Sequence, residues 1–429
     1  MDQYIQSSSS LEKKGTVTRV TGLVIESEGP EAALGDIVKI HSPKKDWNIS
    51  AEVVGFRENK VLLMPLEEIH DIHPGCHITA SSQTVNIPIG PALVGRVIDG
   101  LGRPIDGKGP LLSDQTQGLY NKPPNPMSRA PIKTVFQTGI KAIDTFTPLG
   151  CGQRVGIFSG SGVGKSTLLG MIARGAESDI NVIALIGERG RELREFIEND
   201  LGPEGMAKSI LVVSTSDQAA PMRLRAAFLA TRIAESFRDS SQKVLLLMDS
   251  ITRFAMAQRE IGLAIGEPPT SRGYTPSVFS HLPRLLERSG MNEHGSITAL
   301  YTVLVEGDDL NEPISDAVRG ILDGHIILSR ELAAANHFPS IEVLDSISRL
   351  VRALLPEEKR QVISKARDLL TLYRKNEDLI NIGAYAQGSS PQLDIAIEKQ
   401  PQLMTFLRQD TQEKVSREES FEQLSAILS

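Results

Sequence analysis

The chain has 429 residues and a formal net charge of −7, so it is long enough for two or three domains and carries no overall basic field. Aromatic residues make up only 4%, which together with the charge argues against a nucleic-acid partner. The sequence contains no apolar run of about 18 residues that could cross a membrane, and its N-terminus lacks the apolar core of a secretion signal. Its two cysteines, Cys76 and Cys151, lie far apart, which favours a reducing compartment. We therefore expect a cytoplasmic protein.

The N-terminal part has the pattern of a small all-β domain. Residues 1–14 are polar and rich in serine, and we expect a flexible tail there. From 15 to 90, short runs rich in β-branched residues alternate with Gly, Pro and Asn, which predicts a closed β-barrel with strands at 16–20, 23–26, 36–40, 51–56 and 60–64. His73, Cys76 and His77 lie close together, but without a fourth metal ligand nearby we favour a polar turn.

Two stretches after this segment are interpreted as connectors. Residues 95–107 are dense in turn formers, and residues 123–126 have the sequence PPNP, typical of an extended linker over the surface. We assign no chemistry to either stretch.

The stretch 154–170, RVGIFSGSGVGKSTLLG, contains the clearest motif. Its apolar run at 155–158 predicts a buried strand, and the apolar residues from Leu168 onward recur at helical spacing. The glycine-rich loop between them lets successive backbone N–H groups point at one phosphate at the N-terminus of a helix, the order of a P-loop. Ser159 stands where the usual pattern has glycine, and we expect the three following glycines to preserve the cradle. A glycine-rich turn before a helix is the alternative interpretation.

The P-loop interpretation assigns a nucleotide site. Lys165 would reach the β- and γ-phosphates of ATP, and the hydroxyl of Ser166 would hold Mg²⁺. The expected nucleotide contacts in the loop are Ser161, Gly162, Val163, Gly164, Lys165, Ser166 and Thr167.

Four further apolar runs follow, at 182–186, 210–213, 244–248 and 297–305, with helical patterns between them. Near-continuous apolar strands alternating with helices predict a parallel sheet covered on both faces, hence an α/β fold. Polar or charged residues follow each run. Because ligands lie at the carboxyl ends of parallel strands, these residues are candidates for the site.

Three of these strand-end residues have proposed roles. Asp249 follows five apolar residues, the usual context of a Walker-B aspartate that acts on Mg²⁺, and a cap for the next helix is the alternative interpretation. Glu188 is our candidate for the carboxylate that polarises the attacking water, with a surface ion pair in the charged GERGRE run as the alternative. Arg189 could contact the γ-phosphate.

The last part of the chain has helical patterns. Val362, Ile363, Ala366, Leu369, Leu370 and Tyr373 recur at helix spacing, and residues 406–428 show a similar stripe. These stripes favour a packed core over a binding surface.

Four longer segments resemble one protein family. They are GSGVGKSTLLGMIARGAE, ALIGERGRELREFIENDLG, LLLMDSITRFAMAQREIGLAIGEPPTSRGYTPSVFSHLPRLLERSG and LVEGDDLNEPISDAVRGILDGHIILSRELA. Together they are similar to the export ATPases of the bacterial flagellum and of type III secretion systems, which are relatives of the rotary ATP synthase α and β subunits. The resemblance covers residues 15–429, and the wording FAMAQREIGLAIGEPP and PPNPMSRAPI favours the flagellar branch over the injectisome branch.

The resemblance implies a fold and additional site residues. The fold would be a β-barrel domain at 15–90, a RecA-like ATPase domain at 91–355 and an α-helical domain at 356–429. Lys165, Glu188 and Arg189 would keep the roles given above. Arg253 matches a further arginine at the nucleotide site, Phe338 matches the aromatic residue that stacks on adenine, and Arg349 matches an arginine finger that a neighbouring subunit inserts.

The resemblance also implies partners. An arginine finger acting between subunits implies a homohexameric ring, with activity that depends on assembly. The loop 266–274 would face the central pore and meet a coiled-coil stalk protein. The other implied partners are a stator or regulator protein, the export gate at the membrane and secretion chaperone–substrate complexes. The protein would then be cytoplasmic and peripheral to the inner membrane at the export apparatus.

Three alternative functions stay open at this stage. A catalytic subunit of a rotary synthase would share the core, although the sequence between residues 187 and 290 resembles the export branch. A hexameric RNA helicase would need a basic and aromatic N-terminal barrel, and the segment 15–86 contains only Trp47 and Phe56 as aromatic residues. A nucleotide-binding module without turnover would have no use for both Glu188 and Arg349.

Overall fold

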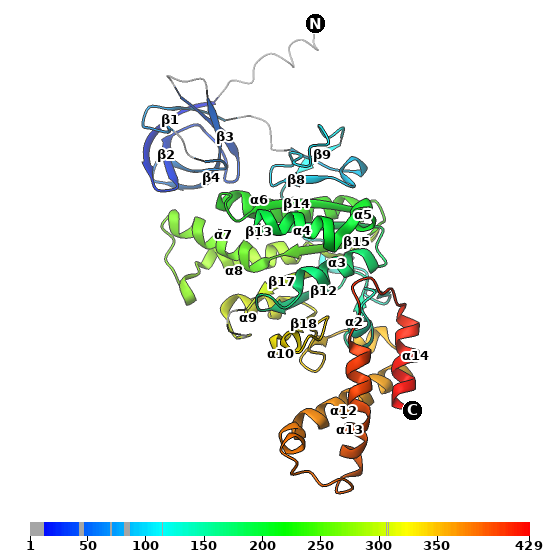
Figure 1. Ribbon diagram of the computed structural model, residues 1–429. Helices are drawn as coiled ribbons and strands as arrows, with labels where there is room; N and C mark the ends of the chain where they lie inside the picture. Colours follow the sequence, from blue (N-terminus) through cyan, green and yellow to red (C-terminus); the bar gives the residue numbers. More distant parts are fainter. Residues whose placement is uncertain are drawn as a thin grey trace.

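The computed structural model describes residues 13–42, 47–68, 71–80, 86–113, 115–305, 307 and 309–429. Figure 1 shows a small barrel at one end, a central α/β body, and a group of helices at the other end, where the C-terminus lies. Within the described ranges, no helix is both long enough and apolar enough to span a membrane.

The barrel closes in the strand order β1-β2-β5-β4-β3-β6. Its strands are β1 Lys13–Thr21, β2 Val24–Glu28, β3 Ile37–His41, β4 Asn48–Arg57, β5 Lys60–Pro65 and β6 His77–Ala80. Alternate side chains such as Val17, Ile25 and Leu63 point inward and form a separate core, which confirms the barrel prediction.

Two expectations about the barrel are corrected. The predicted tail 1–14 ends earlier, because Lys13 and Lys14 pair with Ala80 and Thr79 of β6, while residues 1–12 lie outside the described part of the chain. The strand β6 itself was not predicted, since Ile78 is the only large apolar residue in its four positions. It forms because both β1 and β3 offer it backbone partners that close the barrel.

The body is built on a sheet in the order β19-β18-β12-β17-β15-β13-β14-β8, with β16 beside β17. The strands are β8 Val97–Asp99, β12 Arg154–Ser159, β13 Ile180–Glu188, β14 Ser209–Thr215, β15 Lys243–Asp249, β16 Gly290–Met291, β17 Ser296–Leu304, β18 Gly324–Leu328 and β19 Ile347–Ser348. From β18 to β8 all neighbours are parallel, as predicted.

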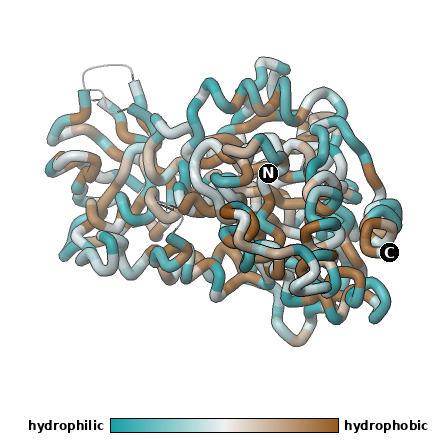
Figure 2. The backbone as a smooth tube through the Cα atoms, turned by 60° about the horizontal axis from the view of Figure 1, so that its bottom comes forward, coloured by the Kyte–Doolittle hydropathy of each residue, from teal (hydrophilic) through white to brown (hydrophobic). Residues whose placement is uncertain are grey.

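Helices cover both faces of this sheet. They are α2 Lys141–Phe146, α3 Lys165–Gly175, α4 Gly190–Glu195, α5 Gly202–Ala207, α6 Ala220–Asp239, α7 Ile251–Ala264, α8 Pro276–Leu286, α9 Pro313–Ile321, α10 Arg330–Ala334 and α11 Val351–Leu354. The strand β15 shows why its sequence is continuously apolar. Leu246 and Met248 enter the core under α6, α7 and α8, whereas Leu245 and Leu247 enter the core under α2 and α3. Figure 2 shows apolar segments inside the body and hydrophilic ones along its outside.

The stretch 95–107, interpreted above as a connector, contains an edge strand. Val97, Ile98 and Asp99 pair in parallel with β14, although turns flank them closely on both sides. The short elements beside it and elsewhere are β7 Asn86–Pro88, β9 Thr116–Gly118, β10 Val135–Phe136, β11 Leu149–Gly150, η1 Pro91–Leu93, η2 Pro126–Ser128, η3 Phe196–Leu201 and η4 Ser271–Gly273.

The C-terminal helices are α12 Glu357–Asn381, α13 Pro391–Leu407 and α14 Arg417–Leu428. In α12 the predicted stripe is the packed face, with Ile363, Ala366 and Leu370 buried. The stripe expected over 406–428 is interrupted, because the chain leaves the helix after Leu407 and a capping box at Ser416 starts α14.

A buried ion pair connects α6 with the residues that follow α8. Glu235 and Arg288 are 0% and 1% exposed, and two hydrogen bonds of 2.8 and 2.9 Å connect them. Arg232 and the amide of Asn121 donate to the same carboxylate at 2.9 and 3.0 Å. Burial raises the pKa of Glu235, but Arg288 together with the hydrogen bonds from Asn121 and Arg232 outweighs it, so this pKa lies below its ordinary value.

We predict that Arg288→Met lowers the free energy of unfolding by about 3 kcal/mol, because the buried Glu235 carboxylate loses its main partner. The matched control is Arg194→Met, which removes an exposed i,i+4 pair with Glu198 and should cost less than about 1 kcal/mol. Chemical denaturation of the two variants measures this difference. Equal losses would show that the buried pair contributes no more than a surface pair.

Candidate active site

The P-loop joins β12 to α3. Gly162 and Gly164 have φ angles of +79° and +82°, a left-handed conformation that glycine adopts without strain. Lys165 then begins α3, so its ammonium group and the backbone N–H groups of the first turn lie at one end of the helix. The loop therefore has the backbone shape that a phosphate cradle needs.

Ser159, the departure from the usual motif, is the last residue of β12 and is buried. Its φ angle is not positive, so the position does not require glycine. A Cβ on the next residue, Gly160, would lie 2.4 Å from Nε of Arg330, so the Arg330 side chain would have to move. The substitution at Ser159 thus leaves the loop geometry intact.

Three charged side chains meet beside the loop. Lys165 Nζ lies 2.5 Å from Oδ1 of Asp249 and 3.8 Å from Oε1 of Glu188. The two carboxylates come from the carboxyl ends of β13 and β15, which are neighbours in the sheet, with Leu185 opposite Asp249. The parallel register therefore places both acids at the same edge, next to the start of α3.

These charges alter one another's protonation. Burial and the nearby Asp249 carboxylate raise the pKa of Glu188, the Lys165 ammonium lowers it, and the net pKa is about 7. Burial lowers the pKa of Lys165, but the two carboxylates outweigh it, and the net pKa is above its ordinary value. Glu188 is thus poised to exchange a proton near neutral pH, whereas Lys165 stays cationic.

A polar cavity of about 460 Å³ surrounds this group. It is lined by Gly160, Ser161, Gly162, Val163, Gly164, Lys165, Ser166, Thr167, Gly187, Glu188, Arg189, Glu192, Ser216, Arg253 and Leu304. The structure therefore brings together the predicted loop residues with Glu188, Arg189 and Arg253.

The two arginines of the cavity differ in exposure and in hydrogen-bond partners. The Arg189 side chain is 79% exposed, and its guanidinium pairs with Glu192 at 3.0 Å. Arg253, on α7, packs against Gly187, and its buried Nε has no hydrogen-bond partner among the described residues. A buried cationic N–H without a protein acceptor fits an anionic ligand such as a phosphate.

The donors of the cavity also fit a magnesium ion. The hydroxyl of Ser166 and the carboxylates of Glu188 and Asp249 are hard oxygen ligands, the type that Mg²⁺ prefers. Ser166 and Asp249 would hold the ion, and phosphate oxygens would complete its shell.

Phe338 lies beside the loop despite its distance in sequence. Its ring atoms are 3.3 Å from the place of a Cβ on Gly164, and the residue is 41% exposed. The hydroxyl of Ser340 donates to the carbonyl of Val163 at 2.7 Å and fixes this segment to the loop.

Arg349 does not line the P-loop cavity of its own chain. It is exposed, donates to the carbonyl of Arg319 at 3.2 Å, and lines a separate groove with Arg352 and Arg360. Its guanidinium is therefore not among the groups that surround the Lys165–Asp249 pair in its own chain.

Sequence reasoning missed Thr302, which lies within the apolar run 297–305. Its buried hydroxyl donates to Oδ1 of Asp249 at 2.6 Å, so the same oxygen accepts from Lys165 and from Thr302. No local signal distinguishes Thr302 from Thr298 and Tyr301, the other hydroxyl residues of that run.

Comparison with protein families divides the chain into three parts. Residues 17–81 match the β-barrel domain of the ATP synthase alpha/beta family, residues 139–348 match the nucleotide-binding domain of that family, and residues 355–426 match the C-terminal domain of the type III secretion ATPase EscN.

Individual relatives match over nearly the whole chain. The flagellum-specific ATP synthase of Bacillus subtilis is 54% identical over 99% of this chain and 97% of its own length. The type 3 secretion system ATPase of Xanthomonas euvesicatoria is 48% identical, with 96% and 93% covered.

Solved structures agree with this result. The assembled ATPase EscN of enteropathogenic Escherichia coli superposes with a TM-score of 0.92 at 44% identity, covering 97% of this chain and all of that one. EscN in complex with its central stalk EscO gives a TM-score of 0.89 over the same shares. The chain therefore belongs to the ATP synthase alpha/beta family, in its branch of flagellar and type III secretion ATPases, and is itself an ATPase.

Proposed function

We propose that this chain hydrolyses ATP with Mg²⁺ to energise protein export through a flagellar type III secretion apparatus. The observation that carries the proposal is the convergence of Lys165, Glu188 and Asp249 beside the P-loop. The flagellar assignment draws on relatives from Bacillus subtilis, Treponema pallidum and Salmonella typhimurium, all called flagellum-specific ATP synthases and 54%, 50% and 48% identical to this chain.

In the proposed reaction, water attacks the γ-phosphorus in line, and the bond to the oxygen of ADP breaks. Glu188 accepts a hydrogen bond and then a proton from the attacking water. Lys165 binds the β- and γ-phosphate oxygens, and Arg189 and Arg253 add positive charge where negative charge develops. Bound Mg²⁺ would supply further charge neutralisation at these oxygens. The adenine would stack on the exposed ring of Phe338.

We further propose that the active unit is a homohexameric ring in which Arg349 enters the neighbour's site. Arg349 is exposed and lies outside the cavity of its own chain, and the relative EscN has been solved as an assembly. A head-to-tail interface repeated around a closed ring gives each site one such arginine.

The remaining partners follow from the same assignment. The relative EscN binds a central stalk, and we propose that the loop 266–274 of this chain meets an equivalent coiled-coil protein. In this loop Arg272 forms ion pairs with Asp309 and Glu312 at 2.9 and 2.5 Å. The C-terminal helices would engage chaperone–substrate complexes near the export gate, and a stator protein would hold the ring at the cytoplasmic face of the membrane.

Deleting the gene from its source bacterium tests the biological assignment. Loss of flagellar filaments and swimming, restored by the intact gene but not by a Lys165→Ala copy, is the expected result. Normal flagella together with lost secretion of effector proteins would favour an injectisome instead.

Activity should rise with pH through neutrality. Glu188 acts as a base only when ionised, and its pKa is raised to about 7, so kcat/KM should increase between about pH 6 and pH 8. Glu188→Gln should be inactive across this range. Glu192→Gln removes a carboxylate that raises the Glu188 pKa, so the midpoint should move to lower pH. A flat wild-type profile would contradict the assignment of Glu188 as the base.

Mixing two inactive variants tests the shared site. Arg349→Ala should lose about a thousandfold in kcat, and Glu188→Gln should be inactive. Their mixture should recover part of the activity, because a finger from the Glu188→Gln subunit completes a site in the Arg349→Ala subunit. Arg352→Ala, an exposed arginine in the same groove, is the control and should keep wild-type activity. No recovery, with specific activity independent of protein concentration, would refute the ring mechanism.

A further inference from the structure

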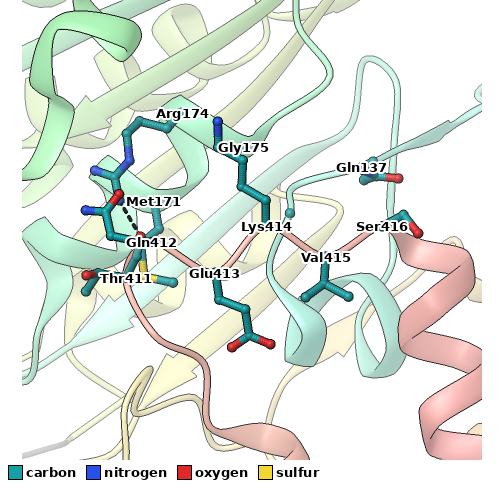
Figure 3. Close-up of a pocket in the computed structure, with 11 residues that line it drawn as sticks. Gln137, Met171, Arg174, Gly175, Thr411, Gln412, Glu413, Lys414, Val415 and Ser416 are labelled. Atoms are coloured by element: carbon teal, nitrogen blue, oxygen red, sulfur yellow. Dashed lines mark hydrogen bonds between the residues drawn. The ribbon is translucent and has the colours of Figure 1, made fainter.

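The segment 408–416 between α13 and α14, here called the α13–α14 connection, packs on the ATPase body. Arg174, near the end of α3, donates to the carbonyl of Thr411 at 2.6 Å. Figure 3 shows Arg174 extended toward Thr411 as the connection passes the end of this helix. Lys414 pairs with Glu204 at 2.7 Å. The connection is therefore attached to the helix that begins at the P-loop.

Gln409 is the buried residue at the centre of these contacts, with 6% exposed. Its Oε1 accepts from the backbone N–H of Lys141 at 2.8 Å. Its Nε2 donates to the carbonyls of Gly139 and Glu413 at 2.8 and 3.1 Å. Two acceptors face the amide nitrogen and one donor faces the oxygen, so only one orientation of the side chain satisfies all three bonds.

The backbone of the same residue reaches the proposed adenine site. The N–H of Gln409 donates to the carbonyl of Phe338 at 3.0 Å. On the side that faces the P-loop, the Ser340 hydroxyl donates a hydrogen bond to the Val163 carbonyl, and the Phe338 ring lies against Gly164. Phe338 is thus held between the P-loop and Gln409, and Gln409 in turn is held by the segment that precedes α2.

We propose that Gln409 is a positioning residue for nucleotide binding, which fixes Phe338 in the place where adenine stacks. This inference rests on the proposed function, in which Phe338 contacts the base. It also gives the helical C-terminal domain a route to the site. Any displacement of α13 and α14 relative to the ATPase body would move the Gln409 N–H and the Phe338 carbonyl that accepts from it. The affinity for the adenine base would then change, whereas the phosphate contacts would stay the same.

The test compares ATP kinetics of the full-length chain and its Gln409→Met variant. Methionine has a similar size but cannot form the three side-chain hydrogen bonds. We expect KM for ATP to rise about tenfold and kcat to stay within about twofold of wild type. Affinity for magnesium tripolyphosphate, which has no base, is measured by competition and should not change.

Matched variants make the result specific. Gln409→Glu keeps the acceptor for Lys141 and loses both donors, so it should also raise KM. Gln409→Asn keeps the amide on a shorter side chain, and serves if the other two variants do not fold. Gln412→Ala changes an exposed side chain of the same connection and should behave as wild type. Phe338→Ala should raise KM at least as much as Gln409→Met.

The outcomes separate this inference from the proposed function. If Phe338→Ala raises KM but none of the folded Gln409 variants does, the positioning role is refuted and the ATPase mechanism stands. If the Gln409 variants lose kcat and tripolyphosphate affinity as well as raising KM, the positioning role is also refuted. The substitution would then disturb the whole nucleotide site and not the adenine contact alone. An unchanged KM in Phe338→Ala removes the basis of the inference. A wild-type chain that does not hydrolyse ATP would instead refute the proposed function.

Discussion

The parallel register of β13 and β15 is the constraint on which the candidate site depends. It sets Glu188 and Asp249 side by side at one edge of the sheet, where α3 presents Lys165. Two carboxylates this close repel each other, and the ammonium group between them offsets that repulsion. Both sheet faces are buried, so a slip that drew Glu188 or Asp249 into the apolar interior would bury an unpaired charge, and this opposes a change of register.

The same arrangement explains why the site is suited to phosphate chemistry. Lys165 is held by the acids and by its place at the first turn of α3, so little reorganisation is needed to meet a polyphosphate. Thr302 shares an oxygen of Asp249 with Lys165 and limits how that carboxylate can turn. Arg253 keeps a buried N–H without a described protein acceptor. The cavity thus combines oriented cations with a carboxylate whose pKa is near neutrality.

The three parts of the chain are joined by side chains that reach across their boundaries. Arg57 of the barrel donates to the carbonyl of Ile265 at 2.7 Å, at the start of the proposed pore loop. Glu52 of the barrel pairs with the buried Arg225 of α6 at 3.3 Å, yet burial outweighs this partner and raises the Glu52 pKa to about 7. At the opposite end of the body, Gln409 makes the corresponding contacts between the C-terminal helices and the ATPase body. Movements of the outer parts can therefore reach the ATPase body through a few polar contacts.

The sequence by itself determined the barrel, the P-loop, the apolar central strands and the acids that follow them, since local periodicity and glycine spacing encode these features. Resemblance to relatives, not spacing, pointed to Phe338 and Arg349. Only the tertiary structure decided that β6 and β8 are strands, that Thr302 bonds to Asp249, and that Gln409 lies behind Phe338. Each of these depends on a partner far away in the chain, and a short or isolated polar residue carries no local signal of the neighbour that folding brings to it.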